Sequence, residues 1–378
     1  MARSMRLARD MYIVLLLHLA WALMAVPVVT RQQRVPASAA TWLALILLLP
    51  VAGTLLYILA GYRRNGPAAD CPACRGDHLE QIIAHGCGTR PTRYNRVGLL
   101  HNGNNAFTAL IASLQRAVRS IHMEYYIIRD DRIGHTIAEI LIRKARAGLE
   151  VRVIYDAVGS WRLSRKTLRR MHDAGVETAA FEPVRFPWFT TRVTHRNHRK
   201  IVVTDGKVAY LGGINIAKYY LDGDYMGKWR DEHLRIEGEA VDDLQRLFAA
   251  DWALEGGEPL SEGLYAAAPA DDLPCSPLQI AWTREDRSRT TLTDLFAQLI
   301  EEARHTLRIS SPYFLPPPAL YEALLRAVRR GCRVLVMLPA RSDVWLARRA
   351  TDAYLGELLG AGVEIFRFRG GFLHAKRL

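Results

Sequence analysis

The sequence predicts an α/β protein of two related lobes that follow a membrane-anchoring helical hairpin. Three observations support this prediction. Two long apolar stretches fall within residues 1–65, patterns typical of strands and helices alternate through residues 97–255, and the same order of patterns begins again after residue 278. A chain of 378 residues has room for two domains, and such alternation is typical of α/β layer architectures.

The first 65 residues predict two membrane-spanning helices. Residues 12–30 contain one ionisable side chain, His18, and residues 42–62 contain none except tyrosines. Each stretch has about the 20 residues that a spanning helix needs. The alternative for the first stretch is a secretory signal peptide, because arginines precede it, but a second apolar stretch follows at once. Arginines flank both outer ends of the hairpin and favour a cytoplasmic location for them.

Residues 66–96 are interpreted as a juxtamembrane linker that carries three cysteines. Cys71, Cys74 and Cys87, together with His85, have the side chains to provide four zinc ligands. Their spacing is not that of a common zinc module. We therefore expect no metal site, and free thiols or a redox pair instead.

Apolar periodicity predicts the elements of the body. Apolar side chains three and four residues apart indicate helices, and short β-branched runs bounded by turn residues indicate strands. The predicted helices are residues 107–118, 137–145, 241–252, 292–300 and 324–331, and the predicted strands are residues 120–128, 151–155, 201–203, 208–211, 306–311 and 333–338.

The second half of the body repeats the first. Arg146-Ala147-Gly148 precedes the strand that begins at Val151, and Arg329-Arg330-Gly331 precedes the strand that contains Val334. This parallel indicates an internal duplication of a whole lobe. The expected lobes are residues 97–255 and 278–378, with a Gly-, Ala- and Pro-rich linker at 256–277 between them.

A histidine, a lysine and an aspartate before and after a short buried strand form the central motif. His198, Lys200 and Asp205 are spaced so that the period-2 alternation of a strand places the first two side chains on one face. An imidazole and an ammonium aimed at one spot suit attack on phosphorus. The imidazole acts as nucleophile or acid/base, and the ammonium offsets charge on the phosphoryl oxygens.

A second copy of this motif begins at the end of the sequence. His374 and Lys376 repeat the His-x-Lys spacing, and the matching aspartate would fall at position 381, beyond Leu378. We expect the chain to be a fragment with an incomplete second lobe, because nothing upstream looks degenerate.

The motif and its flanks resemble the phospholipase D superfamily, and the bacterial cardiolipin synthases in particular. The resemblance rests on Asn197-His198-Arg199-Lys200, Asp205 and Gly212-Gly213-Ile214-Asn215, extends from Val97 to the last residue, and includes a further landmark at Trp229–Arg235. It implies a two-lobed, pseudo-twofold fold, here with the second lobe truncated.

This resemblance also implies a mechanism without metal or cofactor. His198 and His374 would face one another, one attacking a phosphodiester to give a phosphohistidine and the other protonating the leaving alcohol. The remaining candidates have supporting roles: Lys200 and Lys376 neutralise phosphoryl oxygens, Asp205 orients a histidine, Asn215 donates to a phosphoryl oxygen, and Glu124 and Tyr313 lie near the substrate. A solvated carboxylate at a strand end is the alternative for Glu124.

For a cardiolipin synthase, the implied reaction converts two phosphatidylglycerol molecules into cardiolipin and glycerol. The expected partner is a phospholipid membrane containing these lipids, and the expected location is the bacterial inner membrane, crossed more than once, with the catalytic body in the cytoplasm. The net charge of +13 agrees with an anionic partner of any kind.

Three alternatives stay open at this stage. One is another phospholipase D-type transfer or hydrolysis of phospholipids. A second is a nucleic-acid phosphodiesterase, which the charge favours and the hairpin disfavours. The third is a membrane protein without turnover, because the second motif is incomplete.

Overall fold

A computed structural model describes residues 36–49, 52, 53, 57, 78–183, 196–260, 273–283 and 291–378. The first expected span, residues 12–30, lies outside the described residues, as do Cys71 and Cys74, and only part of residues 42–62 lies within them. Helix α2 covers Pro36–Leu48. Among the described residues, no helix combines the length and the apolar character that a membrane crossing needs.

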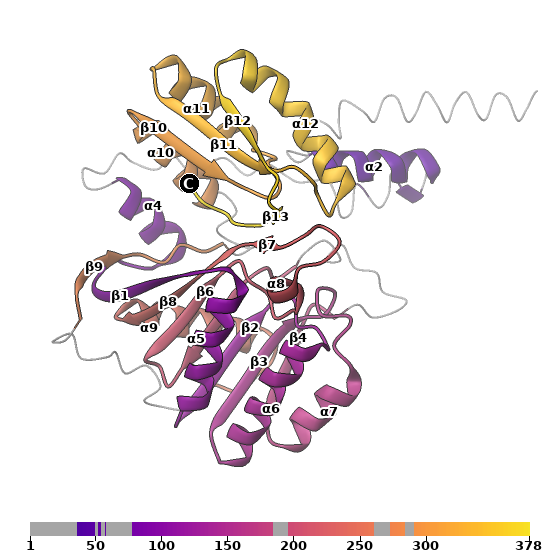
Figure 1. Cartoon of the computed structure of the whole chain (residues 1–378), viewed down its shortest axis with the longest axis vertical. Coiled ribbons are helices and arrows are strands. Elements are labelled where there is room, and N and C mark those ends of the chain that lie inside the picture. The colour runs from indigo at the N-terminus through magenta and orange to yellow at the C-terminus, as the bar shows by residue number, and fades with distance from the viewer. Residues whose placement is uncertain are drawn as a thin grey trace, which may run out of the picture.

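The first lobe is built on an eight-stranded mixed sheet with the order β4-β3-β2-β5-β6-β8-β1-β9 (Figure 1). Strands β2, β3 and β4 are parallel, whereas β5, β6, β8, β1 and β9 continue the sheet in antiparallel fashion. Their bounds are β1 Thr92–His101, β2 Ser120–Tyr125, β3 Glu150–Asp156, β4 Glu177–Phe181, β5 Lys200–Thr204, β6 Val208–Gly212, β8 Glu232–Gly238 and β9 Cys275–Leu278.

Helices cover both faces of this sheet, because alternate residues of its central strands are apolar and point to opposite sides. Val202 of β5 packs in the core formed with α5, α6 and α7, whereas Ile201 and Val203 pack in the core formed with α9. The helix bounds are α5 Asn102–Arg116, α6 Arg132–Arg146, α7 Arg165–Asp173, α8 Tyr219–Asp222 and α9 Ala240–Leu254. Asp131 and Ser164 cap α6 and α7 with their side chains.

The second lobe has a parallel three-stranded sheet of the order β10-β11-β12. Its apolar core includes Leu324, Val334, Val336 and Leu358. The bounds are β10 Thr306–Ser310, β11 Arg333–Pro339, β12 Glu364–Phe368, α10 Thr291–Glu302, α11 Pro318–Arg329 and α12 Trp345–Gly360.

A two-stranded parallel ladder joins the two lobes. Strand β7, Trp229–Arg230, comes from the first lobe, and β13, Phe372–Leu373, comes from the end of the chain. Figure 1 shows this ladder lying between the two sheets. The residues immediately after both strands are therefore brought together.

The structure differs from the expected boundaries in both linkers. Strands β1 and β9 draw residues 92–96 and 275–277 into the first sheet. Helix α4, His78–Cys87, lies in the expected juxtamembrane linker and packs with α10. Most residues of β1 are exposed on both faces, so the strand lacks the apolar alternation that would have revealed it.

Cys87 has a packing role in the described structure. Its thiol is buried at the α4–α10 contact and donates a hydrogen bond to the Trp282 carbonyl at 3.0 Å. Burial raises the pKa of this thiol. Among the described residues, no group of three His, Cys, Asp or Glu side chains is placed to hold a metal ion.

Candidate active site

A cavity of about 1650 Å³ is lined by residues of both lobes. His198 and Lys200 contribute to its wall from the first lobe, and His374 and Lys376 contribute from the second. The fold thus brings the two His-x-Lys pairs together, although they are far apart in the sequence. The imidazoles and amines of the two pairs in one cavity are a combination suited to an anionic substrate.

His198 lies just before β5 and is held by its neighbours on both sides. The backbone amide of Asn197 donates to Asp156 Oδ2 at 3.1 Å, and that of Arg199 donates to Asn197 Oδ1 at 3.0 Å. The imidazole stacks on Tyr126 with 3.9 Å between ring centroids. Burial and the adjacent Lys200 and Lys376 lower the pKa of His198 to about 4, so the ring is neutral at pH 7.

The two lysines repeat one local geometry. Lys200 Nζ donates to the carbonyl of His198 at 2.5 Å, and Lys376 Nζ donates to the carbonyl of His374 at 2.8 Å. Burial, followed by repulsion from Lys376, lowers the pKa of Lys200 to about 7. Burial also lowers the pKa of Lys376. Two buried amines whose charged forms are costly to desolvate are placed to bind an anionic group.

His374 is held against the first lobe by backbone and side chain. Its amide donates to the Arg230 carbonyl at 2.8 Å, directly after the β7–β13 ladder. Its Nδ1 lies 2.6 Å from Asp231 Oδ2, and Asp231 is 2% exposed. With Nδ1–H donating to this carboxylate, the other ring nitrogen, Nε2, is left to face chemistry.

Asp231 is a site residue that sequence reasoning missed. The only signal was its place in the Trp229–Arg235 landmark, to which no chemical role was attached. Asp231 and its neighbour His233 also explain two glycines that lie against them. A Cβ at Gly213 would lie 2.2 Å from Asp231 Oδ1, and a Cβ at Gly212 would lie 2.6 Å from His233 Nδ1. Larger residues at either position would displace these side chains.

Asp205 does not have the expected role of orienting a histidine. It follows β5, whereas His198 precedes it, and five strand residues span roughly 15 Å. Its carboxylate accepts hydrogen bonds of 2.7–3.1 Å from the backbone amides of residues 118–120, at the beginning of β2. Asp205 therefore stabilises the turn, where its own φ is +55°.

Glu124 is neither a solvated carboxylate nor part of the described cavity wall. It is fully buried on β2 and accepts a hydrogen bond from the Asn197 side chain. Arg199 Nη1 lies 3.6 Å from its Oε1 and also pairs with Asp251. Burial and the nearby Asp251 raise the pKa of Glu124 to about 8. This carboxylate supports the segment that carries His198 and does not touch the cavity.

Asn215 and Tyr313 both line the cavity, and both have protein partners. Asn215 Oδ1 accepts from the Ile127 amide, and its Nδ2 donates to the Tyr220 hydroxyl at 3.2 Å. That hydroxyl lies 3.4 Å from His374 Nδ1. Tyr313 donates to Asp343 at 2.6 Å. Donation from Asn215 to a phosphoryl oxygen stays a prediction.

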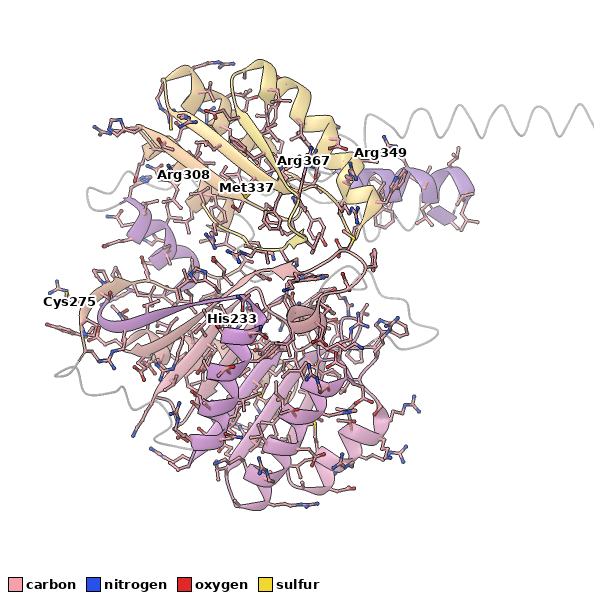
Figure 2. The ribbon with its side chains drawn as sticks, in the orientation of Figure 1. His233, Cys275, Arg308, Met337, Arg349 and Arg367 are labelled. Atoms are coloured by element: carbon pink, nitrogen blue, oxygen red, sulfur yellow. The ribbon has the colours of Figure 1, made fainter. Side chains whose placement is uncertain are left out.

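His233 is a third imidazole in the cavity wall, labelled in Figure 2. It is 3% exposed, and neither ring nitrogen has a hydrogen-bond partner among the described residues. Burial lowers its pKa to about 4, so it is neutral at pH 7. Sequence reasoning missed it because His233 carries no motif spacing of its own.

Two α/β lobes that each add a His-x-Lys pair to one cavity define a phospholipase D-like protein. The comparisons agree with this class. The family model described as "Cardiolipin synthase, PLD-like domain" matches residues 110–252 and 296–378, and one described as "Phospholipase_D-nuclease N-terminal" matches residues 19–61.

Curated relatives narrow the assignment. "Cardiolipin synthase" of Halalkalibacterium halodurans is 34% identical over 377 residues, covering 92% of this chain and 75% of the relative. "Cardiolipin synthase 2" of Bacillus anthracis is 36% identical over 376 residues, covering 92% and 73%. The chain belongs to the cardiolipin synthase family of phospholipase D-like enzymes.

A solved structure confirms the fold at lower identity. The phosphatidylserine synthase of Haemophilus influenzae aligns with a TM-score of 0.52 at 15% identity, covering 79% of each chain. This similarity concerns the mixed α/β two-lobed fold alone. The family relationship makes the chain a phosphatidyltransferase.

Proposed function

We propose that this enzyme transfers a phosphatidyl group from one phosphatidylglycerol molecule to another, giving cardiolipin and glycerol through a phosphohistidine. One observation carries the proposal. His374, oriented by Asp231 at 2.6 Å, lines the same cavity as His198, Lys200 and Lys376. A nucleophile, an acid/base and two cations are the groups that a two-step phosphoryl exchange needs.

Burial lowers the pKa of both histidines, so it is the lack of a carboxylate partner among the described residues that favours His198 as the nucleophile. Its ring is neutral at pH 7, and the described residues offer it stacking on Tyr126 rather than a hydrogen bond. His374 has Asp231 beside it, and a carboxylate stabilises the imidazolium that forms during proton transfer. His374 is therefore assigned as the acid and base.

The reaction then balances in two displacements. His374 begins this step as an imidazolium, with Nδ1–H on Asp231 and a second proton on Nε2. A ring nitrogen of His198 attacks the phosphorus of the donor, the phosphorus–oxygen bond to the head-group glycerol breaks, and His374 gives its Nε2 proton to the departing oxygen. Neutral His374 next takes the proton from a head-group hydroxyl of the second phosphatidylglycerol. That oxygen attacks the phosphorus and releases His198. Lys200 and Lys376 offset the charge on the phosphoryl oxygens in both steps.

The proposal includes anchoring by residues 1–65 as a transmembrane hairpin in the bacterial inner membrane, with both lobes in the cytoplasm. The hydropathy of residues 12–30 and 42–62 supports it, and so does the N-terminal family match over residues 19–61. Anchoring raises the local lipid concentration at a site where water would otherwise compete as acceptor.

The test uses the purified full chain in vesicles of phosphatidylglycerol labelled in the terminal glycerol. We expect cardiolipin and free labelled glycerol in equal amounts, and no product from His198→Ala. Phosphatidic acid in place of cardiolipin would indicate a hydrolase. Product formation only after phosphatidylethanolamine is added would indicate a different donor, and transfer by His198→Ala at the wild-type rate would refute the mechanism.

A further inference from the structure

We propose that two tryptophan–arginine pairs, one on each lobe, dock the mouth of the active-site cavity onto an anionic phospholipid bilayer. The pairs are Trp345 with Arg349 on α12 and Trp161 with Arg162 in the connection between β3 and α7. This inference rests on the proposed function, because it assigns the route by which lipid reaches the same cavity. It adds a protein surface that the chemistry alone does not require.

The beginning of α12 exposes a run of large apolar side chains. Val344, Trp345 and Leu346 are 44%, 67% and 62% exposed. The helix has a separate buried side for its own lobe, formed by Thr351, Leu355 and Leu358. The first turn is thus not needed for the core of the second lobe. Contiguous exposed apolar side chains of this size mark interaction sites.

This apolar turn stands at the cavity mouth. Val344 and Ala347, on either side of Trp345 and Leu346, line the cavity that holds both histidines. Trp161 and Tyr225, 69% and 78% exposed, line it from the first lobe. Exposed aromatic residues therefore surround the opening from both lobes. A surface that is continuous with a lipid-transfer site identifies the occupant as lipid.

The basic partners fit an anionic head-group layer. The Arg349 guanidinium, labelled on α12 in Figure 2, lies 5.6 Å from the Trp345 ring centroid, and that of Arg162 lies 4.9 Å from the Trp161 ring centroid. Neither arginine pairs with a carboxylate among the described residues. Tryptophan and arginine together are typical of the membrane interface, where the ring sits at head-group depth and the cation meets lipid phosphate.

Four aspartates of the rim have hydrogen-bond partners within the protein, which hold their side chains in place without removing their charge. Asp131 caps α6, Asp130 accepts from Thr167, Asp224 accepts from the Met226 amide, and Asp343 accepts from Tyr313. The arginines are left to face solvent. With a net charge of +13 on the whole chain, the preferred bilayer is anionic.

The first experiment measures contact directly in the full chain. The variant His198→Ala is used because it should not convert the lipid during the measurement. Its amide hydrogen exchange is followed in nanodiscs of phosphatidylglycerol, in nanodiscs of phosphatidylcholine and in detergent. Peptides covering residues 158–163 and 343–350 should exchange at least about fivefold more slowly in phosphatidylglycerol than in the other two. Equal exchange in all three contradicts the proposal. If exchange is already slow in detergent, protein and not lipid covers the surface.

The second experiment separates docking from chemistry. Trp345→Ser/Leu346→Ser should lower the transfer rate on phosphatidylglycerol vesicles about tenfold or more. Its rate on monomeric dihexanoyl phosphatidylglycerol, which needs no interface, should stay that of the wild type. The matched control is Val118→Ser/Leu254→Ser, which removes side chains 74% and 64% exposed away from the mouth and should leave both rates unchanged.

The results distinguish the two proposals. An equal loss on vesicles and monomers, or no loss on either, overturns the docking surface while the proposed function stands. A wild-type chain without transfer on either substrate overturns the proposed function instead. The exchange measurement still tests docking in that case, because it needs no turnover.

Discussion

Asp231 of the first lobe holds His374 of the second lobe through a hydrogen bond of 2.6 Å. The two residues are 143 positions apart in the chain and meet because β7 and β13, which directly precede them, form one ladder. The carboxylate that orients His374, the proposed acid and base, therefore comes from the opposite lobe. The proposed acid/base function depends on the two lobes staying docked.

Replacing Asp231 with Asn should lower kcat by about 10²–10⁴-fold with little change in KM, because the imidazolium of His374 loses its carboxylate. Transfer on phosphatidylglycerol vesicles measures both constants. Asp242→Asn, which disturbs an ion pair on α9 with Arg246, is the matched control and should behave as wild type. A wild-type kcat for Asp231→Asn would remove the acid/base assignment of His374.

The nucleophile can be identified with a donor that needs no general acid. Phosphatidyl p-nitrophenol releases nitrophenolate unaided, so His374→Gln should give a burst of about one equivalent and then stop, with the phosphatidyl group left on His198. His198→Gln should give no burst. Stopped-flow absorbance measures the release, and the opposite pattern would exchange the two roles.

The pH profile should fall on its alkaline side because of Lys200. Burial and Lys376 lower the pKa of this amine from 10.5 to about 7, so the cation is present below pH 7 and is lost as the pH rises above it. We expect kcat/KM, which reports the free enzyme, to decline above about pH 7. Lys200→Arg stays charged throughout this range. The residual activity of Lys200→Arg should therefore not decline above pH 7. If the decline stays as in the wild type, it is caused by another group.

Asp205→Ala should destabilise the fold without changing the chemistry. The substitution removes the acceptor for three backbone amides, at about 1–3 kcal/mol of unfolding free energy. The φ of +55° adds strain for alanine, whereas asparagine tolerates it, so Asp205→Asn should lose less. Denaturant unfolding measures the loss, and kcat per folded enzyme should match the wild type. A large drop in kcat with normal stability would restore a catalytic role.

Substitutions of Arg199 and of its buried partner Glu124 should lower the stability by different amounts. Arg199→Met leaves the buried Asp251 carboxylate without this guanidinium and should lower the unfolding free energy by about 3–5 kcal/mol. Glu124→Gln should be far milder, because burial and Asp251 already raise the pKa of Glu124 to about 8, so it is mostly protonated at pH 7. Equal losses would show that Glu124 is charged in the folded protein.

Much of the fold could be predicted because apolar periodicity is a local property. The predicted strand at 201–203 is the centre of β5, and the predicted helix at 241–252 lies within α9. Strands that are exposed or very short were not predicted. Strand β1 has no buried face to leave a pattern, and two-residue β7 is too short for any periodicity.

The sequence by itself determined the family, the α/β class and the two His-x-Lys pairs, because strand alternation and motif spacing act over a few residues. Only the tertiary structure decided which carboxylate serves a histidine. It assigned Asp231 to His374 and Asp205 to the backbone at the beginning of β2. The physical reason is that hydrogen bonds form between groups that are close in space. The pairing of strands between the lobes determines which groups are close.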